Sequence, residues 1–169
     1  MRYFLGLNLE PAIKLAIDDW RHKALPKFQF PVTASNLHIT LVFLGNVNHK
    51  ALEQLTARID AITASPFSLH LNQLGYWSKP RVLWLGAQTV DDNMYALVEN
   101  LTQAANQCGM NIPKQPYIPH VSLARKLNSN PAAAIIEPNF ACDFDQIHLY
   151  ESVSGSNGVQ YLIRDSWSL

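Results

Sequence analysis

The sequence has few cysteines, no surplus of either charge and no long apolar run. Of its 169 residues, only Cys108 and Cys142 are cysteines. Both fall at apolar-periodic positions, so we interpret them as small buried hydrophobic residues and not as a disulfide or a catalytic thiol. No apolar run reaches the roughly 20 residues that cross a bilayer, and the opening RYFLGLNLE lacks the cleavage site of a signal peptide. Together with the sparse cysteine, these absences predict a cytoplasmic protein.

The charges balance, with 13 basic and 13 acidic side chains. A protein that grips many phosphates along a duplex usually carries a basic excess, because its affinity comes from displaced counterions. Neutrality therefore argues against a long nucleic-acid footprint, but it is compatible with binding one phosphate or one chain end. The length suits one compact domain or two small lobes that share a core, and we expect a monomer.

Hydrophobic periodicity predicts a succession of strands and helices. Alternating or apolar runs indicate strands at residues 2–9, 36–44, 67–74, 81–87, 117–124, 140–150 and 159–168. Helical spacing indicates helices at 10–25 and 49–64, a third that Asp91 or Asp92 caps and that runs to Gly109, and a short one at 131–137. This order is typical of a mixed α/β or α+β fold, with helices against an antiparallel-rich sheet. Long helices before LHITL and PHVSL indicate a weak internal duplication.

Two histidines, His38 and His120, lie in strand-like runs, and each is followed two residues later by a hydroxyl, Thr40 or Ser122. Successive strand residues alternate faces and advance about 3.3 Å, so each histidine and its hydroxyl project from the same face, about 7 Å apart. The apolar residues between and after them point into the core. The remaining histidines, His22, His49, His70 and His148, have no serine or threonine at this offset. We interpret those four as surface or locally hydrogen-bonded residues.

Such a set of side chains suits the opening of a cyclic phosphodiester. The reaction needs a base to deprotonate water and an acid to protonate the leaving oxygen, and the pKa of histidine lies near neutrality, so one imidazole can do each task. Hydroxyls can hold the non-bridging oxygens and stabilise the charge that grows in the transition state. A strained five-membered ring lessens the need for a metal. The alternative is that both pairs are ordinary polar strand residues.

The runs NLHITLVFLGNV, RVLWLG and PYIPHVSLAR resemble the two-histidine phosphoesterase superfamily. Within it, the chain is most similar to the bacterial RNA 2′,3′-cyclic phosphodiesterases, also called 2′-5′ RNA ligases. The similarity spans nearly the whole chain and includes two His-x-Thr/Ser motifs 82 residues apart. It implies a two-lobed, LigT-like α+β fold, in which antiparallel-rich sheets line a central cleft and helices pack outside. It also implies that no cofactor is needed.

The resemblance implies roles for individual residues. His38 matches the proton donor of the family and His120 the proton acceptor, while Thr40 and Ser122 occupy the phosphate-binding hydroxyl positions. Arg125 matches an arginine near the phosphate, and a permanently charged bidentate donor suits that place. Strand alternation puts Arg125 out of phase with His120 unless the strand bends or ends, so a surface arginine is the alternative. Enzymes of this family open RNA ends that carry a 2′,3′-cyclic phosphate to leave a 2′-phosphate, and they reversibly join 2′-5′ linkages without ATP.

Aromatic side chains near the motifs could stack on a terminal base, since every base has a π face. The candidates are Tyr117 and either Trp77 or Tyr76, and Arg81 could add charge at the edge of the cleft; for each, a packing or surface role is the alternative. Three further hypotheses concern the whole chain. The substrate could be a small nucleotide such as a 2′-5′ oligoadenylate or ADP-ribose cyclic phosphate, or the chain could be a non-catalytic module that binds RNA ends. A metal site is disfavoured, because neither motif histidine has Cys, Asp or Glu at ligand spacing.

Overall fold

The computed structural model describes all 169 residues. Its elements are β1 (Arg2–Asn8), α1 (Pro11–Ala24), a 3-10 turn (Ala34–Asn36), β2 (His38–Asn46), α2 (His49–Asp60), β3 (Phe67–Leu71), β4 (Gln73–Trp77), β5 (Val82–Gly86), α3 (Asp92–Gln107), β6 (His120–Ala124), β7 (Phe140–Phe144), β8 (Gln146–Gly155) and β9 (Gly158–Ser168). None of these helices is both long enough and apolar enough to span a membrane.

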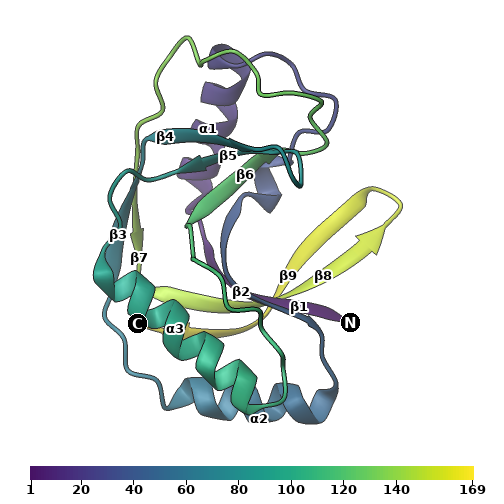
Figure 1. Cartoon of the computed structure of the whole chain (residues 1–169), viewed down its shortest axis with the longest axis vertical. Helices are drawn as coiled ribbons and strands as arrows, with labels where there is room; N and C mark the ends of the chain where they lie inside the picture. Colours follow the sequence, from purple (N-terminus) through teal and green to yellow (C-terminus); the bar gives the residue numbers. More distant parts are fainter.

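Seven strands form one sheet in the order β4-β5-β6-β2-β1-β8-β9, and β3 pairs with β7 in a second, two-stranded sheet. Every pairing is antiparallel. The predicted α+β class with an antiparallel sheet is therefore confirmed. The large sheet has two parts, β4-β5-β6 and β2-β1-β8-β9, and a single registered pair, Ile39 with Val121, joins them. In Figure 1, α1 lies with the first part, whereas α2 and α3 lie below the second.

One face of the sheet is buried in the core. Leu5 and Leu7 of β1, Ile39 of β2, Leu85 of β5 and Val121 of β6 are all completely buried. Strand alternation then places the residues between them on the opposite face, where the functional side chains lie. The helices complete the core with their own apolar stripes, which include Ile17, Leu55 and Leu97.

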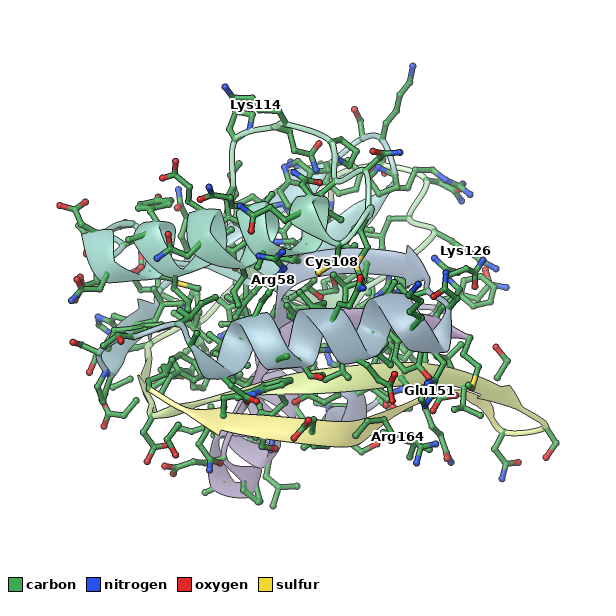
Figure 2. All side chains as sticks on the ribbon, turned by 90° about the horizontal axis from the view of Figure 1, so that it is seen from below. Arg58, Cys108, Lys114, Lys126, Glu151 and Arg164 are labelled. Carbon is green, nitrogen blue, oxygen red and sulfur yellow. The ribbon has the colours of Figure 1, made fainter.

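The helix boundaries follow from local sequence signals. Pro11 begins α1, where its missing N–H costs nothing. The side chain of Asn48 caps α2 by accepting from the Ala51 amide at 2.8 Å, and that of Asp91 caps α3 by accepting from the Asn93 amide at 2.9 Å. The helices α2 and α3 lie side by side, and Arg58 donates from α2 to the side chain of Gln107 on α3 at 2.8 Å; Figure 2 labels Arg58 between them.

Several expected boundaries were wrong. No helix forms at residues 131–137; this segment lies on α1, where the Ile135 amide donates to the Ala24 carbonyl and the Ile136 carbonyl accepts from the Trp20 indole. The expected strand 67–74 is interrupted at Asn72, so that its two parts belong to different sheets. The expected strand 117–124 begins only at His120. Of the two free cysteines, Cys142 is buried as expected, whereas Cys108 ends α3 and is half-buried.

The β8–β9 hairpin projects beyond the rest of the sheet (Figure 1). About midway along it, Arg164 Nε donates to the buried Glu151 carboxylate at 2.6 Å, and Figure 2 shows this pair on the hairpin. Near its tip, the Asn36 side chain donates to the Val159 carbonyl at 2.7 Å. Because Asn36 lies two residues before His38, this bond holds the hairpin beside the start of β2.

Candidate active site

The two motifs lie on neighbouring antiparallel strands and share one face of the sheet. Ile39 pairs with Val121, and both point into the core. The antiparallel register therefore sets His38 beside Ser122, and Thr40 beside His120, on the opposite face. Each histidine lies next to the hydroxyl of the other motif, and the two histidines are diagonal neighbours, a relation that puts two residues about 7–8 Å apart and their Cβ atoms somewhat closer.

Both imidazoles are held in the same way. His38 Nδ1 lies 2.7 Å from the carbonyl of Asn36, and His120 Nδ1 lies 2.8 Å from the carbonyl of Ile118. Since a carbonyl only accepts, Nδ1 carries the proton in each ring and donates it, and Nε2 is left with its lone pair. His38 Nε2 accepts from the Thr40 hydroxyl at 3.0 Å.

The surroundings favour the neutral form of each ring. Burial lowers the pKa of His38 to about 4, and Arg125, His120 and Lys14 add electrostatic lowering, while the hydrogen bond to Asn36 opposes the shift. Burial also lowers the pKa of His120, and Arg125 acts in the same direction. An anion seated between the rings would counter both effects, because it stabilises imidazolium.

An aromatic cluster surrounds His38. Phe4 lies 4.9 Å and Tyr161 4.8 Å from the imidazole, centre to centre, and Tyr150 stacks on Phe4 at 4.9 Å. Gly6 provides the room, since a Cβ there would lie 2.8 Å from the Ile39 carbonyl oxygen and 3.3 Å from the Tyr150 ring. These rings come from β1, β8 and β9, the three strands that follow β2 in the sheet order, so they reach His38 only once the sheet has formed.

A second aromatic cluster flanks His120. Trp77 contacts the imidazole edge-on at 4.6 Å, Trp84 lies 6.2 Å from it, and the two indoles are 4.8 Å apart. Trp84 lies flat against the sheet because Gly75 and Gly86 have no side chains: a Cβ at Gly75 would overlap its ring, and one at Gly86 would lie 2.6 Å from it. We call Trp77 and Trp84 the indole wall.

The remaining sequence candidates fall in different places. Arg125 is exposed directly after β6, which ends at Ala124. The strand alternation that would turn Arg125 to the face opposite His120 therefore no longer applies at this residue. Tyr76 points to the core side of β4, away from Trp77. Arg81 is exposed in the β4–β5 turn, with a positive φ of 69° and Nη1 3.5 Å from the Asn128 side chain.

Tyr117 is half-buried, and its ring packs against the core. Its hydroxyl donates to the backbone carbonyl of Thr40 at 2.8 Å. These contacts are those of an anchored side chain and lend no support to base stacking by Tyr117.

Four residues around the histidines were not predicted from the sequence: Phe4, Tyr150, Tyr161 and Trp84. The first three had no usable signal, because nothing in the sequence states the order of the strands in the sheet. Trp84 did have one, since it lies in the RVLWLG run and shares the strand alternation of a site-facing residue.

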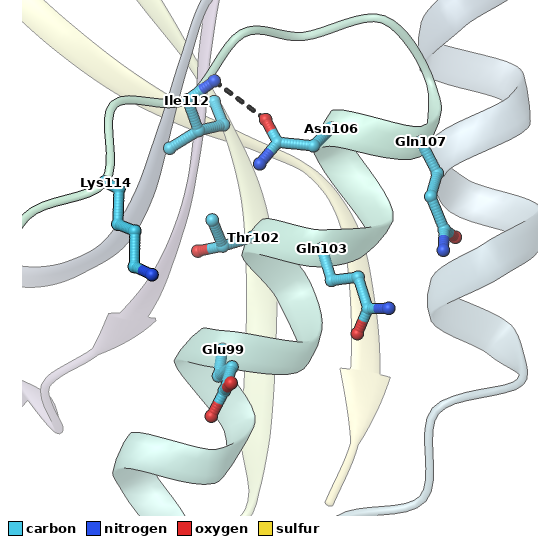
Figure 3. Close-up of a pocket in the computed structure, with 7 residues that line it drawn as sticks. All are labelled: Glu99, Thr102, Gln103, Asn106, Gln107, Ile112 and Lys114. Atoms are coloured by element: carbon cyan, nitrogen blue, oxygen red, sulfur yellow. Dashed lines mark hydrogen bonds between the residues drawn. The ribbon is translucent and has the colours of Figure 1, made fainter.

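A groove elsewhere on the surface contains none of these residues. It runs along the outer side of α3 and is lined by Glu99, Thr102, Gln103, Asn106, Gln107, Ile112 and Lys114 (Figure 3). Apart from Ile112, its lining residues are polar, and the Asn106 side chain already accepts from the Ile112 amide at 2.8 Å. No group of three or more His, Cys, Asp and Glu side chains in the chain is placed to hold a metal ion.

Comparison with known proteins agrees with this geometry. A model of the 2′-5′ RNA ligase superfamily matches residues 9–155. An RNA 2′,3′-cyclic phosphodiesterase of Escherichia coli K12 is 30% identical over an aligned length of 171. The alignment covers 99% of this chain and 96% of the relative. The crystal structure of E. coli LigT in its apo form superposes with a TM-score of 0.90 at 30% identity, covering 99% of this chain and 96% of that one. Its complex with 3′-AMP superposes with a TM-score of 0.91 at 30% identity, covering 99% and 97%. On this sequence and structural likeness, the chain belongs to the 2′-5′ RNA ligase superfamily.

Proposed function

We propose that the protein hydrolyses the 2′,3′-cyclic phosphate at the 3′ end of RNA to a 2′-phosphate, with two histidines and without a metal or nucleotide cofactor. The observation that carries the proposal is the face-sharing arrangement of His38, Thr40, His120 and Ser122 on two adjacent strands. Relatives that bear the name RNA 2′,3′-cyclic phosphodiesterase support the choice of substrate, as does an E. coli LigT structure that holds 3′-AMP.

In the proposed reaction the cyclic phosphate lies between the two imidazoles. His120 Nε2 takes a proton from water, whose oxygen forms a bond to phosphorus. The bond between phosphorus and the 3′ oxygen breaks in line, and His38 Nε2 gives its proton to that oxygen. One water is thereby added across one P–O bond, and the phosphate remains on the 2′ oxygen. A proton then has to return from His120 to His38 through solvent before the next turnover.

The charges of the site fit these roles. In the free protein, burial and Arg125 hold both rings neutral at pH 7, which suits His120 as a base. His38 has to be protonated to act as an acid, and the bound phosphate anion provides the stabilising charge. The Thr40 and Ser122 hydroxyls donate to non-bridging oxygens, and the Arg125 guanidinium offsets the charge that grows on them.

The indole wall supplies a half-buried stacking surface beside His120, and Trp77, the indole nearer the imidazole, is the ring that a base would contact. Arg81, at the end of the β4–β5 hairpin, adds positive charge at the rim. If a ribose 5′-hydroxyl replaces water beside His120, the same atoms form a 2′-5′ linkage without ATP. We further propose that the chain acts as a cytoplasmic monomer on RNA ends or on small nucleotides with a cyclic phosphate.

The histidine assignment is tested with an RNA oligonucleotide that ends in a 2′,3′-cyclic phosphate. We expect His38→Ala and His120→Ala each to lower kcat by at least about a thousandfold, because each removes a whole proton-transfer step. His49→Ala is the matched control, since that side chain is exposed on α2 and should leave kcat unchanged. Circular dichroism of each variant checks that the fold persists.

Three other measurements separate the alternatives. Activity that EDTA abolishes would contradict the metal-free reaction. Rapid turnover of 2′-5′ oligoadenylate or ADP-ribose cyclic phosphate, with none of the RNA substrate, would assign a small-nucleotide phosphodiesterase instead. Stoichiometric binding of the RNA end with no product after long incubation would identify a binding module.

A further inference from the structure

The hydroxyl of Tyr117 makes a hydrogen bond between the two motifs. Tyr117 lies three residues before His120, and its hydroxyl donates to the carbonyl of Thr40 at 2.8 Å across a sequence separation of 77 residues. Thr40 in turn donates its own hydroxyl to His38 Nε2 at 3.0 Å. A short chain of bonds therefore connects the segment that leads into one histidine with the residue that holds the other.

This bond lies where the sheet is weakest. Between β2 and β6 only Ile39 and Val121 form a registered pair, whereas β1 and β2 have pairs from Arg2–Asn46 to Asn8–His38. The Tyr117 hydroxyl thus supplies a donor to β2 just beyond the point where the backbone ladder stops.

Packing holds the Tyr117 side chain in place, and its hydroxyl stays protonated. Its ring packs against the core and meets the Tyr95 ring edge-on at 6.5 Å. Burial raises the pKa of the Tyr117 hydroxyl, so it stays protonated and remains a donor throughout the neutral range.

We propose that Tyr117 is a positioning residue, which sets the separation of His38 and His120 through its bond to the Thr40 carbonyl. The proposal rests on the proposed function in one respect: the catalytic importance of that separation. Tyr117 itself does not touch the substrate. One imidazole transfers a proton at the attacking oxygen and the other at the leaving oxygen of the same phosphorus, so both rings have to be correctly placed. A displacement of about 1 Å can cost about a hundredfold in rate.

The test compares Tyr117→Phe with Tyr95→Phe, a matched control that removes a tyrosine hydroxyl from the neighbouring exposed ring. With the cyclic-phosphate RNA, we expect Tyr117→Phe to lower kcat about tenfold or more and to change KM less than about twofold, because the groups that contact the substrate remain. Tyr95→Phe should change neither. An unchanged kcat, or a rise in KM alone, would overturn the positioning role, the second result pointing to substrate contact.

Histidine NMR gives a readout that does not depend on turnover. In Tyr117→Phe, the imidazole signals and titration midpoints of both His38 and His120 should move, whereas Tyr95→Phe should leave them in place. Signals that stay in place in Tyr117→Phe would refute the proposal. If the wild-type protein hydrolyses no cyclic phosphate, the proposed function fails, and the NMR comparison still decides whether Tyr117 positions the histidines.

Discussion

Arg125 is the residue whose charge reaches both histidines. It is exposed just past the end of β6, and it lowers the pKa of His38 and of His120 electrostatically. The next residue, Lys126, also carries a positive charge, but its ammonium lies over the Phe30 ring, 4.7 Å from the ring centre. The two adjacent cations therefore form a matched pair in which only one acts on the site.

We expect Arg125→Met to raise the pKa of both histidines, since a cation that disfavours imidazolium is removed. The same substitution should raise KM for the cyclic phosphate about tenfold, because a hydrogen bond to a charged group is lost. NMR titration of the imidazoles and steady-state kinetics measure the two effects. Lys126→Met should leave both quantities unchanged, and equal effects of the two substitutions would show that only general surface charge matters.

At the scale of elements, the β4–β5 hairpin forms the indole wall beside His120. Trp84 can lie flat on it only because Gly75 and Gly86 offer bare backbone on either side. Gly155, in the β8–β9 hairpin, is also in a strand, but a Cβ there would meet only the Gly158 carbonyl oxygen at an ordinary 3.9 Å. A glycine-to-alanine substitution would therefore meet the Trp84 ring at Gly75 but make no close contact at Gly155.

We expect Gly75→Ala to lower the free energy of unfolding by about 1–3 kcal/mol, the usual cost of overpacking. The displaced indole should also alter the near-ultraviolet circular dichroism of the protein and lower kcat/KM through its contact with His120. Gly155→Ala should have little effect on any of these, measured by urea unfolding, spectroscopy and kinetics. A fully stable Gly75→Ala variant with an unchanged spectrum would mean that Trp84 does not need the bare backbone.

The elements also differ in how much of their structure could be predicted from the sequence. Alternation identified the strands of both motifs and the shared face of each histidine with its hydroxyl, because period-2 patterning is a local property. Pairing partners are not local, so Phe4, Tyr150 and Tyr161 could not be assigned to His38 before the sheet order was known. The expected helix at 131–137 failed for a related reason: α1 supplies the hydrogen-bond partners of Ile135 and Ile136. Tertiary contacts decide the conformation of such a short segment.

At the scale of the whole molecule, buried histidines make stability depend on pH. Burial lowers the pKa of His38 to about 4 and also lowers the pKa of His120 and of His148. In the unfolded chain the pKa of each of these histidines returns to about 6.5. Between these values the unfolded chain binds more protons than the folded one, so the free energy of unfolding rises with pH. The stability is therefore fully present above about pH 6.5 and is lost as the pH falls toward 4.

His38 should account for much of this slope, up to about 3 kcal/mol between pH 6.5 and 4 on the shift it shows. Urea unfolding at constant ionic strength, repeated across this window, measures the slope. His38→Gln should flatten it, because the group that must be deprotonated to fold is gone, whereas His49→Gln, at a site whose side chain is 85% exposed, should not. If the wild-type slope survives in His38→Gln, His38 is not held neutral by burial. Its role as the group that gains a proton only when phosphate binds would then lose its physical basis, because the free protein would already protonate His38 near neutrality.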